Sequence, residues 1–294
     1  MTQDTHTNGQ PARALDLGAV WARGSRLLRE NWSLVVVIAG FFVLVPGAAL
    51  QFALPPQGDL QGPLDVLVDP NSGEAAQQRA AQALGALLVP FMGWAMASVV
   101  FAHFGYAAIV ALIGRARPTV GEALGQAAKV LTGLVAAIIL VVAGLWAGLF
   151  LIQLVLSPLG EAVAAFLGSI IGLIFMVYVT ARLSLTLPVM AIEDRFNPIT
   201  ALRRSWRLTA ARPGNVIGFW MILAVVWFVT LMIQIIISSV LAAIPGPGST
   251  ALLIAGLASG AFMMVWGAIY CAMGVAMHRE LAGPGAEEIA TDFE

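Results

Sequence analysis

Six long apolar stretches, nearly free of charged residues, constrain this chain more than any other feature of its sequence. A helix needs about 20 apolar residues to cross a hydrocarbon core of about 30 Å, and lipid leaves the open edges of a sheet unsatisfied. The sequence therefore predicts an all-α, polytopic membrane protein with six transmembrane helices in three hairpins. We place these helices near residues 32–54, 84–113, 130–156, 162–187, 216–244 and 251–277. With 60% hydrophobic and 11% charged residues, a soluble domain is excluded.

The basic residues predict the orientation of these helices, because Lys and Arg are retained on the cytoplasmic side of short loops. Thirteen of the fifteen fall in segments that would share one side, whereas Arg79 falls on the other and Arg182 lies inside the fourth span. We therefore expect both termini in the cytoplasm. A disordered tail at 1–14 and a C-terminal tail at 280–294 would flank one domain at 15–279. A single lysine among fourteen arginines suggests a GC-rich bacterial genome, and hence the bacterial inner membrane.

Turn-forming residues mark the predicted breaks between and within the spans. Pro46 is expected to kink the first helix, and tight turns at 157–160 and 245–248 would close hairpins. The opposite side of the membrane has one sizeable acidic loop at 55–83, whose residues 74–82 could extend the second helix.

Three short amphipathic stretches precede the odd-numbered spans and align without gaps. Asp16, Thr119 and Asn197 are helix-capping residues at their starts. A small residue recurs eight positions later and a basic residue ten positions later, which predicts a helix in the cytoplasmic headgroup layer. The chain would then contain three repeats of surface helix plus hairpin, near 15–114, 118–188 and 196–279. The alternative is that cytoplasmic loops before spans are generally amphipathic and basic.

Membrane lipids are the expected partners of these surface helices, through anionic headgroups on the cytoplasmic side. The residues predicted to contact the headgroups are Arg23, Arg26, Arg203, Arg204 and Arg207. A protein partner is a further possibility.

Arg182 is the only charged residue well inside a span, where a charge is costly and marks a functional-site hypothesis. Three interpretations remain open. The side chain could pair with Glu193 or Asp194, which follow Pro188 closely; it could snorkel to the cytoplasmic interface; or it could belong to a ligand or ion pathway.

Other polar and small residues within the spans have structural interpretations. Tyr106, Tyr178 and Tyr270 fall in the cytoplasmic halves of the even-numbered spans, as an interfacial aromatic belt or a shared functional cluster would require. His103, Gln153 and Gln234 lie within spans and are expected to form hydrogen bonds between helices. Three glycine pairs have the spacing of close helix packing: Gly144 and Gly148, Gly168 and Gly172, and Gly256 and Gly260.

The sequence carries no recognisable enzyme signature. Neither a phosphate-binding loop around Lys129 nor a paired-histidine zinc motif is present, and Cys271 alone forms no disulfide or zinc cluster. No basic run is long enough to follow nucleic acid phosphates. We therefore expect a non-enzymatic protein with no catalytic residue, no cofactor, no metal and no nucleic acid partner.

The stretch from Glu193 to Thr209, EDRFNPITALRRSWRLT, follows an Arg-Leu-Ser-Leu-x-Leu-Pro segment that ends at Pro188. Together they resemble bacterial integral membrane proteins of the glycerophosphoryl diester phosphodiesterase membrane-domain and YciC-like group. The resemblance is sharpest over 178–220 and implies a six-span fold. Some members are fused to a soluble phosphodiesterase barrel; the six spans leave no room for that barrel here, so the resemblance does not imply hydrolase activity.

These observations favour a non-enzymatic inner-membrane protein that acts in membrane organisation, or as a scaffold with a lipid or protein partner. The alternative is a small-molecule or ion transporter or channel built at the interface of the repeats. That alternative would require polar residues to converge near the midplane, and the sequence offers few.

Overall fold

The computed structural model describes residues 16–53, 55, 57–242 and 248–283. Over these residues the chain is almost wholly helical and has no strand. Six helical segments are long and apolar enough to cross a membrane: Trp32–Leu50, Glu74–Gly114, Val120–Leu159, Glu161–Ile192, Pro213–Val240 and Leu253–Ala282. The predicted all-α fold with six potential spans is therefore confirmed. The predicted tail at 1–14, most of the tail at 280–294 and most of the turn at 245–248 lie outside the described residues.

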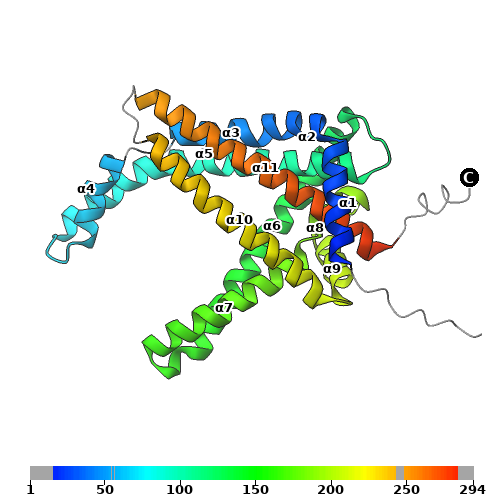
Figure 1. The fold of residues 1–294 in the computed structure, drawn as a ribbon. Helices are drawn as coiled ribbons and strands as arrows, with labels where there is room; N and C mark the ends of the chain where they lie inside the picture. The colour runs from blue at the N-terminus through cyan, green and yellow to red at the C-terminus, as the bar shows by residue number, and fades with distance from the viewer. Residues whose placement is uncertain (1–15, 54, 56, 243–247, 284–294) are drawn as a thin grey trace, which may run out of the picture.

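Several short helices and helix ends gather at one end of the molecule, here called the basic end (Figure 1). It contains α1 (Leu17–Glu30), the C-terminal end of α5 (Glu74–Gly114), the start of α6 (Val120–Leu156), α8 (Thr186–Ile192), α9 (Pro198–Ala210) and the end of α11 (Gly248–Ala282). Arg23 Nη1 of α1 lies 3.4 Å from Glu280 Oε2 of α11. The two ends of the described chain thus lie together, as an even number of spans requires; the side that they face stays a prediction.

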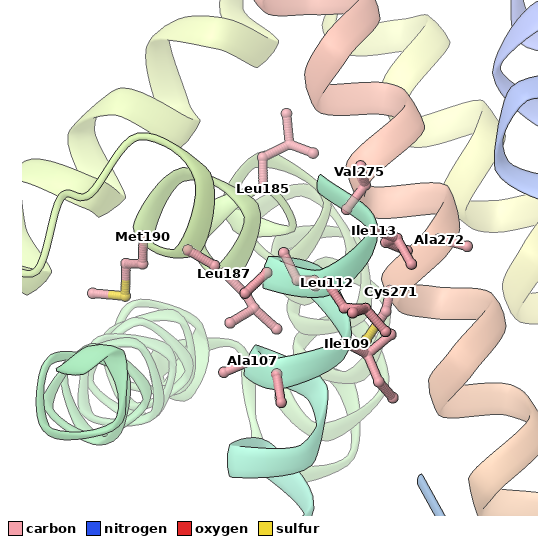
Figure 2. Close-up of a cluster of buried hydrophobic side chains, with 14 of the residues drawn as sticks. Ala107, Ile109, Leu112, Ile113, Leu185, Leu187, Met190, Cys271, Ala272 and Val275 are labelled. Carbon is pink, nitrogen blue, oxygen red and sulfur yellow. The ribbon is translucent and has the colours of Figure 1, made fainter. Parts of the chain in front are cut away.

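The main hydrophobic core also lies at the basic end. The last two turns of α5, from Ala107 to Ile113, are buried residue after residue because α2, α8 and α11 pack around them. Figure 2 shows this part of α5 beside Leu187 of α8 and beside Cys271 and Val275 of α11. In contrast, α7 (Glu161–Leu183) and the distal part of α6 diverge from α5 and α11 (Figure 1). Close packing is therefore concentrated at one end of the spans.

The first span is interrupted where the sequence predicts a kink. α2 (Trp32–Ala39) leads into a π-helical segment, Gly40–Leu44, and then into α3 (Val45–Ala53). Pro46 has no backbone N–H, and its ring would clash with the carbonyl of Phe42 four residues earlier. The wider π turn immediately before Pro46 accommodates this clash without ending the helix.

The segment predicted as an external loop is largely helical. Residues Gln57–Val68 form α4, which packs along α5, and α5 itself begins at Glu74. The predicted extension of the second helix through residues 74–82 is therefore confirmed. α4 was not expected, because Pro63 lies inside it and its apolar residues show little helical periodicity.

The three predicted capping residues all cap helices. Asp16 and Asn197 each accept two backbone N–H groups of the following turn, and Thr119 forms a capping box with Glu122. The residues four and eight positions after each cap are buried in all three segments: Val20, Ala123 and Ala201, then Gly24, Ala127 and Ser205. The three helix starts are confirmed, whereas their origin as repeats stays a prediction.

The second of these segments differs from the expected arrangement. α1 and α9 are separate helices, interrupted before the next span at Asn31 and before Pro213. No interruption of this kind follows Lys129, because α6 is one continuous helix from Val120 to Leu156. The predicted surface helix before the third span is therefore the first part of the span itself.

Close contacts of glycine join the helices of the middle hairpin. A short 3-10 turn, Ser157–Leu159, and Gly160 at φ +89° connect α6 to α7, as the predicted turn requires. A Cβ on Gly148, Gly168 or Gly172 would lie within 3 Å of a side chain on the neighbouring helix, whereas Gly144 faces open space. The packing prediction thus holds for three of these four glycines.

α10 (Pro213–Ala242) packs against α11 and α7. Gln234 Nε2 donates to Ser238 Oγ at 2.8 Å and to Ser259 Oγ of α11 at 2.9 Å. The predicted interhelical hydrogen bond of Gln234 is therefore confirmed.

Candidate functional site

Glu193 joins three elements at the basic end. Its carboxylate follows α8 and accepts hydrogen bonds from Arg195 Nε at 2.9 Å and from Arg204 Nε of α9 at 3.1 Å. Arg204 Nε reaches both carboxylate oxygens, and His278 Nε2 of α11 lies 3.0 Å from Oε1. Because the Glu193 side chain is only 17% exposed, these contacts replace most of its hydration.

The neighbouring carboxylate of Asp194 bonds to different elements. Arg115 Nη1, just past α5, donates to it at 2.8 Å, and Gln126 Nε2 of α6 donates at 2.6 Å. Both donors also bond to the carbonyl of Ala191. Asp194 has a φ of +54°, a conformation that Asp tolerates better than most residues, and this turn separates the two adjacent carboxylates. A polar cavity of about 620 Å³, lined in part by Arg115 and Lys129, adjoins these contacts.

These contacts stabilise the ionised form of both acids. Burial raises the pKa of Glu193, but the hydrogen bonds from His278 and Arg204 outweigh it and hold that pKa below its ordinary value. The hydrogen bond from Arg115 lowers the pKa of Asp194, against a smaller opposing effect of burial. Both groups are therefore carboxylates at neutral pH, and their pairing favours the folded state there.

Arg182 does not pair with either carboxylate, contrary to one of the three interpretations. Glu193 and Asp194 bond to the residues described above, and no acid among the described residues lies within 4 Å of Arg182. Arg182 is only 4% exposed, so the residue lies within the protein; snorkelling to the cytoplasmic interface stays a prediction. Its guanidinium carbon lies 4.4 Å from the ring centroid of Trp206 on α9 and 5.8 Å from that of Tyr178.

The aromatic contacts compensate only part of the cost of this buried charge. Cation–π contacts contribute about 0.5–2 kcal/mol, and they do not replace the hydrogen-bond acceptors that a desolvated guanidinium loses. Within the described part of the chain, Arg182 Nε is buried and has no hydrogen-bond partner. The Nε–H group of Arg182 is therefore desolvated without a hydrogen-bond acceptor in compensation.

The end of α7 beside Arg182 is capped by side-chain hydroxyls. Pro188 has no N–H to donate to the carbonyl of Ser184, so the helix breaks after Leu183 and α8 begins at Thr186. Side-chain hydroxyls lie within hydrogen-bond distance of the carbonyls of residues 181 to 184. Ser184 bonds to Ala181, Ser205 to Arg182, Thr186 to Leu183, and Tyr270, at 3.5 Å, to Ser184. Thr209 Oγ1 lies 3.2 Å from the Arg182 carbonyl and slightly closer to the carbonyls of Ser205 and Trp206.

Sequence analysis missed these hydroxyls. A local signal was available, because Ser184 and Thr186 directly precede Pro188, and a proline there frees the carbonyl four residues before it. The contributions of Ser205, Thr209 and Tyr270 had no such signal, since they come from α9 and α11.

The arginines predicted to contact headgroups fall into two groups. Arg23 pairs with Glu280, and Arg204 pairs with Glu193, so both are used within the protein. Arg26, Arg203 and Arg207 are exposed and have no ion pair with any described residue. These three remain available to lipid.

An apolar groove, here called the aromatic groove, opens between α5, α10 and α11. It encloses about 340 Å³ and is lined chiefly by Tyr106, Trp220, Trp227, Trp266 and Tyr270. A cavity of about 330 Å³ on the α6 side shares Tyr106 and Tyr270 with the groove, and one of about 220 Å³ against α7 shares Trp220 and Tyr270.

The aromatic groove brings together two of the three tyrosines that the sequence analysis singled out. Tyr106 and Tyr270 line the same space, whereas Tyr178 lies beside Arg182 and Trp206. The residues therefore form two separate aromatic sites and not a single cluster.

No family model, curated protein or solved structure matches this chain. The resemblance to the phosphodiesterase membrane-domain group therefore stays a prediction. Its motif, residues 182–209, nevertheless contains the hydroxyl-capped helix break, Arg182 and both paired carboxylates.

Proposed function

We propose that this protein is a non-enzymatic protein of the bacterial inner membrane that organises membrane lipid. A hydrocarbon chain would occupy the aromatic groove, while exposed arginines of α1 and α9 contact anionic headgroups at the cytoplasmic surface. Both termini would be cytoplasmic. Membership of the phosphodiesterase membrane-domain group is part of this proposal, supported by the motif at residues 182–209.

The aromatic groove is the observation that carries the proposal. Its volume of about 340 Å³ lies in the range of ligand sites. Its walls are tryptophan, tyrosine, leucine, methionine, alanine and glycine, which suit a hydrocarbon chain better than an ion or a polar metabolite. The groove lies on helices of the membrane-spanning part, where acyl chains are the most abundant ligand.

The transporter alternative has weaker support. A pathway for ions or polar solutes needs polar side chains at membrane depth. Among the described residues, the ion pairs gather at the basic end, and the side chains lining the aromatic groove carry no formal charge. A dry groove favours retention of lipid over permeation of a polar solute.

Filling the groove tests the proposal. Ala224 lines both the aromatic groove and its neighbour against α7, so Ala224→Phe would occupy the space with a ring. Val225→Phe is the matched control, because Val225 is 58% exposed on the adjacent face of α10. We expect the Ala224 variant, purified in mild detergent, to retain about half or less of the phospholipid that the wild type retains, as quantified by mass spectrometry. Equal retention in all three proteins would contradict the proposal.

A further inference from the structure

Arg182 is a buried cation that the protein itself leaves incompletely satisfied. The side chain is 4% exposed, its Nε is buried without a partner, and its guanidinium makes no hydrogen bond or ion pair to any residue that the structure describes. A charge in such a place normally has an acceptor. The missing acceptor is therefore the feature to explain.

The usual protein acceptors around Arg182 are already used. The carbonyls of residues 181 to 184 accept hydroxyls, and none of them accepts a hydrogen bond from the guanidinium. Glu193 is held by Arg204 and His278, and Asp194 by Arg115 and Gln126. No acceptor within the described chain serves Arg182, and one from outside it would complete the contacts of the guanidinium.

Two aromatic rings lie beside the guanidinium of Arg182. Trp206 and Tyr178 pack against the guanidinium, and their rings meet edge to face at 5.8 Å between centroids. Contacts to the face of a guanidinium leave its N–H groups free to bind an anion in its plane. Both rings are themselves partly exposed, at 38% and 39%, so the site borders the surface of the protein.

The surroundings of the site are positively charged. Arg203 and Arg207 lie three residues before and one residue after Trp206 on α9, and both are exposed without a described ion-pair partner. α9 is the amphipathic helix that the sequence predicts to lie at headgroup depth. Phosphate is the anion that occurs at this depth, and it matches the planar donor fork of arginine.

The geometry points to a phosphate-binding site at Arg182, framed by Trp206 and Tyr178, that holds the phosphate of one anionic phospholipid. The inference extends the proposed lipid function by naming the headgroup contact, but it does not require the aromatic groove to be occupied. Arg182 supplies the buried donor, while Arg203 and Arg207 form a basic rim.

Titration of the full-length, delipidated protein with phosphatidylglycerol tests the site. Native mass spectrometry counts the bound lipids, and thermal unfolding in detergent reports the stabilisation. Arg182→Gln should weaken the tightest lipid by about tenfold or more. Arg117→Gln removes one exposed arginine at the same end, away from the site, and should change that affinity by less than about twofold. An equal loss in both variants would indicate general charge attraction and overturn the proposal.

The lipid-free protein separates a binding role from a structural one. An unsatisfied cation destabilises the fold that contains it, so Arg182→Gln without lipid should melt at the wild-type temperature or above it. Phosphatidylglycerol should then stabilise the wild type more than the variant. A variant that melts lower without lipid and binds phosphatidylglycerol normally would assign Arg182 to the architecture alone and overturn the site.

Two further arms identify the source of the phosphate. Millimolar inorganic phosphate should leave the melting temperature of the wild type unchanged; stabilisation equal to that by phosphatidylglycerol would make this a site for soluble anions and overturn the lipid assignment. Ala224→Phe should lose retained lipid through the aromatic groove but keep the tight phosphatidylglycerol site. Failure of the groove and failure of the Arg182 site are therefore distinguishable.

Discussion

At the scale of single residues, the basic end depends on two adjacent acids with different tasks. Glu193 binds α9 and α11, while Asp194 binds the end of α5 and the start of α6. The left-handed turn at Asp194 directs the two carboxylates to different partners. Proximity in sequence to Arg182 suggested a pairing that the chain does not make, because α8 and the following turn carry both acids to other helices.

Replacement of Glu193 should weaken the fold in a pH-dependent way. Glu193→Gln removes the charge shared by Arg204 and His278, and we expect the apparent melting temperature in detergent to fall by about 3–6 °C at neutral pH. Since the folded-state pKa of Glu193 lies below its ordinary value, its contribution is present at neutral pH and is lost as the pH falls from the ordinary glutamate pKa through the lower folded-state pKa.

On acidification the melting temperature of the wild type should therefore fall further than that of the Glu193 variant, in which Asp194 still titrates with a lowered pKa. Glu74→Gln, in the first turn of α5 and far from these contacts, serves as the control and should follow the wild type. If the melting temperatures of all three proteins fell in parallel with pH, Glu193 would not be the source of the pH-dependent stability.

The hydroxyl cap of α7 gives a second prediction for single residues. In the double variant Ser205→Ala and Thr209→Val, the buried carbonyl of Arg182 loses the Ser205 donor and the neighbouring Thr209 hydroxyl, which should cost about 1–3 kcal/mol. Ser239→Ala with Thr230→Val removes the same groups from exposed positions that bond only within α10. Thermal unfolding of the two double variants should differ clearly; similar melting temperatures would mean that the cap is dispensable.

At the scale of helices, most of what the sequence predicted follows from local rules. Apolar length predicted the spans, side-chain oxygens predicted the caps at Asp16, Thr119 and Asn197, and Pro46 marked a real irregularity. The break before Pro188 was equally local and was missed, because an apolar stretch up to residue 187 was taken as a continuous helix.

Features that depend on distant residues could not be predicted in this way. Arg182 was recognised as unusual, but the ring of Trp206 that covers it comes from another helix. His278 and Gln126 join the two acids only because α11 and α6 end or begin beside α8. Apolar periodicity specifies which residues are buried, whereas the partners of polar groups depend on how the helices cross.

The crossing of α3 and α11 gives a prediction at this scale. A Cβ on Gly260 would lie 2.6 Å from the carbonyl oxygen of Leu44 and 3.3 Å from the backbone nitrogen of Ala48. Backbone cannot move aside as a flexible side chain can, so Gly260→Ala should push the helices apart and lower the melting temperature by several degrees. Gly144→Ala, which meets open space on α6, should raise it slightly by favouring the helix.

At the scale of the whole molecule, the described ends of the chain meet at the basic end, opposite α4 (Figure 1). The excess of basic residues at this end predicts that it faces the cytoplasm. The same bias places the connection between α4 and α5 outside.

Cysteine labelling in intact cells checks this orientation. The native Cys271 is buried and should give little background. A membrane-impermeant maleimide should label Asn71→Cys in intact cells and should label Arg117→Cys only after permeabilisation. The opposite pattern would reverse the topology while leaving the fold unchanged.

The concentration of the core at the basic end also determines how the molecule would respond to its surroundings. A tightly packed end resists deformation, whereas the diverging hairpin of α6 and α7 has few packed neighbours along its distal half. A change in bilayer thickness would therefore be absorbed mainly by tilting of this hairpin. The basic end would keep its geometry in one leaflet. The distal half of the α6–α7 hairpin would change its tilt with the state of the other leaflet.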